Sequence, residues 1–63
     1  MHYTITLGQL TLFFVSGTTR AEADKCARIA RRNGNAGVSI RERNTAPEKG
    51  GLTPARIAEI IRA

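Results

Sequence analysis

Two runs of strand-forming residues near the N-terminus are separated by only Gly8 and Gln9. The first run, His2 to Leu7, alternates apolar with polar residues, and the second, Leu10 to Ser16, is rich in β-branched and aromatic residues. A two-residue connection that begins with glycine is typical of a type II′ turn between antiparallel strands. The sequence therefore predicts a β-hairpin over residues 2–16.

This turn sets which residues of the hairpin lie opposite each other, because strand register follows from turn geometry. One face is predicted to be core and pairs Leu7 with Leu10, Ile5 with Leu12, and Tyr3 with Phe14. The other face is rich in threonine and ends in apolar residues: His2, Thr4, Thr6, Thr11, Phe13 and Val15. Exposed apolar side chains on so small a domain indicate an oligomer interface or a stacking surface, so Phe13 and Val15 are candidates for that role.

The segment after the hairpin has the pattern of an amphipathic helix over residues 20–33. Thr19 and Glu22 have the spacing of a capping box at its start, and Gly34 is a natural stop. The predicted buried stripe consists of small residues, with one larger side chain at its edge: Ala23, Cys26, Ala27, Ala30 and Ile29. Small side chains on this stripe allow the helix to approach a sheet closely.

The remainder of the chain predicts a third strand over residues 38–43, a polar loop over 44–52 and a short helix over 54–62. Residues 1–63 are thus read as a single α+β domain of order ββαβα. We expect a three-stranded, mainly antiparallel sheet with one helix packed on one face and a short C-terminal helix. Two strand orders stay open, 1-2-3 with the apolar second strand in the centre, or the third strand beside the first.

The composition offers no covalent or metal cross-link to a chain of this length. One cysteine and one histidine among 63 residues form neither an intrachain disulfide nor a four-ligand zinc site. A single core in so short a chain rarely contributes more than about 3–5 kcal/mol. A second copy or a larger partner is therefore the expected source of further stability.

Side chains that could carry out catalysis are not grouped in the sequence. Cys26 falls on the predicted buried stripe, and Glu22 and Asp24 lie two positions apart on a helix, where side chains do not face each other. We expect a protein that is not an enzyme, with no catalytic residues, no cofactor and no metal.

Residues 1–19 contain no Asp, Glu, Lys or Arg. They lack the basic start and the long apolar run of a secretory signal, and polar residues interrupt them too often for a membrane span. We therefore expect no membrane partner, and the single unpaired cysteine fits the reducing cytoplasm.

All the charge lies beyond residue 19, where the basic residues dominate and give a net charge of +5. Eight of the ten are arginine, whose planar guanidinium suits phosphate and carboxylate partners. The candidate partner-binding residues form two clusters, Lys25, Arg28, Arg31 and Arg32 on the first helix, and Arg41 and Arg43 on the third strand. If the sheet is continuous, the strand cluster shares a face with Phe13, which is an arrangement that proteins use to bind single-stranded nucleic acids.

The order of strand, capped helix, Gly/Asn turn and strand from Leu10 to Arg43 resembles small proteins of phages and mobile elements, including some anti-CRISPR inhibitors. The residues that carry the resemblance are Lys25-Cys-Ala-Arg-Ile-Ala-Arg-Arg32 followed by Gly37-Val-Ser-Ile-Arg41, and the likeness covers about half of the chain. It implies a non-catalytic inhibitor in the cytoplasm of a bacterial host. Such a protein docks its basic surface on a host nucleoprotein complex.

Three functions stay open at this level. The first is an inhibitor or regulator that docks on a host protein or nucleoprotein complex through its arginine-rich surface. The second is an accessory protein that binds the phosphates of DNA or RNA directly. The third is the structural subunit of a homodimer. Salt titration of binding to bare nucleic acid separates the first two, because phosphate contacts weaken steeply with salt.

Overall fold

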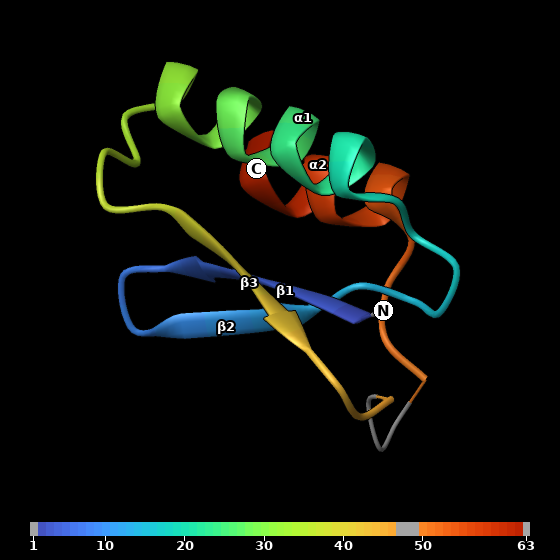
Figure 1. The fold of residues 1–63 in the computed structure, drawn as a ribbon. Helices are drawn as coiled ribbons and strands as arrows, with labels where there is room; N and C mark the ends of the chain where they lie inside the picture. The colour runs from blue at the N-terminus through green and yellow to red at the C-terminus, as the bar shows by residue number, and fades with distance from the viewer. Residues whose placement is uncertain (1, 47–49, 63) are drawn as a thin grey trace.

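The structure, a computed structural model, describes residues 2–46 and 50–62. Its elements along the chain are β1 (His2–Leu7), β2 (Leu10–Phe13), α1 (Arg20–Arg32), β3 (Ser39–Arg43) and α2 (Pro54–Arg62). Both helices lie on one side of a twisted three-stranded sheet (Figure 1). The predicted α+β class and the order ββαβα are confirmed.

The central strand of the sheet is β1, with β2 and β3 antiparallel to it on either side. The predicted order with the third strand beside the first is therefore correct, and the order 1-2-3 is wrong. The outer edge of β2 is partly occupied by Leu52, whose N–H donates to the Phe13 carbonyl and whose carbonyl accepts from Val15 N–H, both at 2.8 Å. The charged strand β3 instead takes the other edge, where its side chains reach water.

The hairpin has the predicted register, with Ile5 opposite Leu12 and Leu7 opposite Leu10. Gly8 has a φ of +63°, and no residue other than glycine has a positive φ among those described, so the turn has the pattern that type II′ requires. Strand β2 ends at Phe13 rather than at Ser16. Leu10 is 50% exposed, not buried as predicted, because it lies at the turn end of an edge strand.

Helix α1 begins at the predicted residue, Arg20, and ends one residue before the predicted end at 33. The Thr19 side chain accepts a hydrogen bond from Glu22 N–H, and the Glu22 carboxylate accepts from Thr19 N–H at 3.0 Å, which completes the capping box. The helix ends at Arg32, and Gly34 follows with a φ of +91°. All four small residues of the predicted stripe are buried against the rest of the core, namely Ala23, Cys26, Ala27 and Ala30.

The core lies between the sheet and the two helices. Strand β1 supplies Tyr3 and Ile5, Phe14 directly follows β2, and α2 supplies Ile57, which is fully buried. Helix α2 also lies alongside α1 (Figure 1). Since a nine-residue helix is unstable alone, this burial is what maintains α2.

The segment between β3 and α2 carries the chain from one edge of the sheet to the other. It leaves the sheet at Arg43, opposite His2, and returns beside Phe14 through the parallel bridge to Leu52. Residues 47–49 of the predicted loop lie outside the described residues.

Among the residues that are described, no helix is both long enough and apolar enough to cross a membrane.

Candidate functional site

One face of the sheet has no helix packed on it (Figure 1). Thr4 lies at the centre of this face, directly opposite Phe13 on β2 and Arg41 on β3. Because side chains alternate along a strand, the following strand residues share the face with Thr4: His2, Thr6, Thr11, Phe13, Ser39, Arg41 and Arg43. We call this set the open sheet face.

The open sheet face combines an aromatic ring with two cations. Phe13 is 38% exposed, and Arg41 and Arg43 are both exposed. None of the strand residues on this face is acidic. The register thus places Phe13 on the same face as Arg41 and Arg43, as expected for a continuous sheet. Val15, the second candidate for an oligomer interface or stacking surface, is half-buried, and its N–H donates a hydrogen bond to the Leu52 carbonyl.

The Thr4 side chain is fully buried although no helix covers its face, and its Oγ1 has no hydrogen-bond partner among the described residues. The neighbouring hydroxyls differ, because Thr6 Oγ1 and Thr11 Oγ1 lie 3.3 Å apart and bond to each other. A buried hydroxyl without a partner costs roughly 1–3 kcal/mol. The sequence placed Thr4 on this face but carried no signal of its burial.

The helix cluster lies on the exposed surface of α1. Lys25, Arg28 and Arg32 are spaced three and four residues apart, so they form one row on the side of the helix away from the buried stripe. Arg31 lies to one side of this row, on the flank that also carries Arg20 and Asp24. We call Lys25, Arg28 and Arg32 the α1 basic row.

Most of the described cations have no acidic partner among the residues that the structure describes. Two of the nine described Lys and Arg side chains are ion-paired: Arg20 with Asp24 at 3.1 Å and with Glu42 at 3.8 Å, and Arg56 with Glu59 at 3.0 Å. The other seven have no carboxylate partner among residues 2–46 and 50–62: Lys25, Arg28, Arg31, Arg32, Arg41, Arg43 and Arg62. These unpaired charges include every predicted partner-binding residue.

The two arginine clusters are on opposite sides of the molecule. The α1 basic row points away from the sheet, whereas Arg41 and Arg43 lie on the face of the sheet that α1 does not cover (Figure 1). Arg20, which we did not place in either cluster, connects α1 to β3 through Glu42. Sequence spacing carried no signal for this pair, because the two residues belong to different elements. The domain therefore presents two separate basic surfaces.

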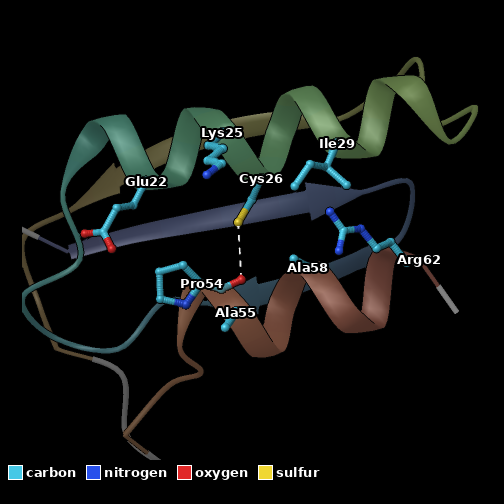
Figure 2. Close-up of a pocket in the computed structure, with 8 residues that line it drawn as sticks. All are labelled: Glu22, Lys25, Cys26, Ile29, Pro54, Ala55, Ala58 and Arg62. Carbon is cyan, nitrogen blue, oxygen red and sulfur yellow. Dashed lines mark hydrogen bonds between the residues drawn. The ribbon is translucent and has the colours of Figure 1, made fainter.

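A groove of about 310 Å³ lies between the two helices (Figure 2). It is lined by Glu22, Lys25, Cys26 and Ile29 of α1 and by Pro54, Ala55, Ala58 and Arg62 of α2. The Cys26 thiol donates a hydrogen bond to the Pro54 carbonyl at 3.5 Å, shown as the dashed line. Burial raises the pKa of Cys26, and the nearby Glu22 carboxylate raises it further while Lys25 lowers it. The thiol is therefore held in its protonated, unreactive form.

No group of three or more His, Cys, Asp or Glu side chains in the described parts of the chain is arranged to hold a metal ion. No protein family, curated sequence or solved structure matches the chain. The functional assignment therefore depends on the residues and their placement.

Proposed function

We propose that this protein is a non-enzymatic inhibitor or regulator that docks on a nucleoprotein complex through its arginine surfaces, in the manner of small phage and mobile-element proteins. The observation that carries the proposal is the set of seven described cations without a carboxylate partner among the described residues, five of which are divided between the α1 basic row and the opposite, uncovered face of the sheet. A nucleoprotein presents both phosphates and acidic side chains, and guanidinium groups bind both.

The α1 basic row is suited to contact a rigid partner surface. Its helix is capped at Thr19 and packed on the sheet through small side chains, so the backbone positions of the three cations are set before binding. Preorganised groups lose less conformational entropy when a complex forms. The opposite surface, with Arg41 and Arg43, is free to contact a second part of the same assembly.

The test is affinity capture from a bacterial lysate, with and without nuclease. Arg28→Glu combined with Arg32→Glu reverses two charges of the α1 basic row. Arg56→Glu combined with Arg62→Glu is the matched control, since it changes the net charge equally on α2. We expect a defined protein to remain bound after nuclease treatment, to be lost with the α1 variant, and to be kept with the α2 variant.

Two results would contradict this proposal. Capture of nucleic acid alone, with no protein retained after nuclease treatment, would favour an accessory protein that binds DNA or RNA directly. Equal loss of the partner with both double variants would show that net charge, and not the α1 basic row, attracts it.

A further inference from the structure

We propose that the open sheet face binds single-stranded nucleic acid, with Phe13 stacked on a base and Arg41 and Arg43 in contact with phosphates. This inference rests on the proposed nucleoprotein target, because it requires unpaired nucleotides in that target. It adds the chemical class of the ligand and assigns the contacts to particular residues.

The first argument is the placement of the aromatic ring relative to the cations. Phe13 and Arg41 both lie opposite Thr4, so their Cα atoms are two strand spacings apart, or roughly 10 Å. A base on the Phe13 ring therefore has its backbone within reach of the long Arg41 side chain. Stacking combined with backbone charge is how proteins bind single strands without reading their sequence.

The second argument is the spacing of the two arginines along β3. Arg41 and Arg43 point to the same face and are roughly 6.8 Å apart along the strand. This distance is close to that between neighbouring phosphates of an extended single strand. With no acidic strand residue on the face, no strand carboxylate there opposes a polyanion.

The third argument is the unpaired Thr4 hydroxyl between Phe13 and Arg41. Arg41 is exposed and has no carboxylate partner among the described residues, so its side chain is free to move onto a phosphate. Thr4 Oγ1 is buried on the same face and has no hydrogen-bond partner among the described residues. A base edge or a sugar hydroxyl that reached it on binding would provide a hydrogen bond to this group.

The test uses tryptophan fluorescence of the purified chain. The sequence has no tryptophan, so Phe13→Trp introduces a single reporter at the proposed stacking position. Leu10→Trp is the matched control, because Leu10 is on the same strand and is 50% exposed, but belongs to the other face. The probes are oligothymidylate of about 12 nucleotides, chosen for the usual length of such sites, and inorganic polyphosphate of similar charge.

We expect oligothymidylate to quench the emission of the Phe13→Trp variant but not that of the Leu10→Trp variant. Polyphosphate should leave the emission of Phe13→Trp unchanged, because it has no bases. Phe13→Leu, measured with a labelled oligonucleotide, should weaken binding roughly tenfold. Arg41→Ala should reduce the salt slope of log K by about 0.7. Arg56→Ala, a surface control outside the face, should not.

Three results would overturn the inference. These are equal quenching of the two tryptophan variants, equal effects of polyphosphate and oligothymidylate, or a Phe13→Trp emission that changes with protein concentration alone. The last result would mean that a second copy of the chain covers the face. Capture through the α1 basic row is a separate readout, so failure of this inference and failure of the proposed function are distinguishable.

Discussion

A Cβ atom on Gly51 would lie 2.7 Å from the carbonyl oxygen of Phe14, which is closer than such atoms can approach. Gly51 also has a φ of +73°, in the region that favours glycine. The segment before α2 therefore passes very close to the end of β2, where the two hydrogen bonds of Leu52 join the two backbones. Only glycine at position 51 permits this approach of the two backbones.

Gly51→Ala should lower the free energy of unfolding by about 2–4 kcal/mol, because backbone strain and steric overlap act together. Gly50→Ala is the matched control, since Gly50 has a φ of +83° but no described atom within 4 Å of its Cβ position. That change should cost about 1–2 kcal/mol, from strain alone. Urea denaturation measures both values, and equal losses would contradict a tight contact at Gly51.

Thr4→Val should raise the free energy of unfolding by about 1 kcal/mol, since a methyl group replaces a buried hydroxyl that has no partner among the described residues. Thermal unfolding would show a rise in Tm of about 4–8 °C. Thr6→Val is the control, because it removes the hydroxyl that bonds to Thr11. A Tm that falls for Thr4→Val would mean that Oγ1 has a hydrogen-bond partner in solution.

Thr19→Ala should destabilise the fold by about 1 kcal/mol, because it removes the acceptor at the start of α1. Thr19→Ser retains the hydroxyl and should remain close to the parent. Helical circular dichroism during a urea titration distinguishes the two variants. Identical midpoints for both would show that the capping box contributes nothing to stability.

The raised pKa of Cys26 predicts slow alkylation and a specific pH dependence. Iodoacetamide at about pH 8 should modify the folded chain much more slowly than the urea-unfolded chain, since the thiolate is the reactive form. The pKa of Cys26 in the folded chain lies above the ordinary value of 9.0. The contribution of the protonated thiol to the free energy of unfolding is therefore fully present below pH 9.0, and it is lost as the pH rises through the folded pKa.

Cys26→Ala lacks this ionisation and provides the comparison. The stability difference between the parent and Cys26→Ala should shrink as the pH rises above 9.0, measured by urea denaturation at several pH values. A constant difference across this range would mean that the folded chain does not perturb the thiol.

The parts of the fold that were predicted correctly depend on residues close together in the sequence. The Gly8–Gln9 turn determines the hairpin register, and the three-residue spacing of Thr19 and Glu22 determines the start of α1. The small residues of the α1 stripe recur at helical spacing, so their burial could also be read from the sequence.

The strand order depended on contacts between distant residues. Strand β2 is the more apolar neighbour of β1, which favoured a central place for it, but Leu52 binds to its outer edge. No local sequence pattern predicts the bridge between Leu52 and Phe14. The same reason explains why Arg62 in the groove and the Arg20–Glu42 pair were not foreseen, since each requires two elements to meet.

The central strand of this sheet, β1, is synthesised before its two neighbours, β2 and β3. The nascent β1 pairs with β2 through the two-residue turn, but its other edge has no partner until β3 emerges after the whole of α1. Until β3 pairs, the hairpin exposes a strand edge without Asp, Glu, Lys or Arg, and such edges associate with one another. We therefore expect the chain to aggregate most readily in states in which the hairpin has formed but β3 has not yet paired with β1.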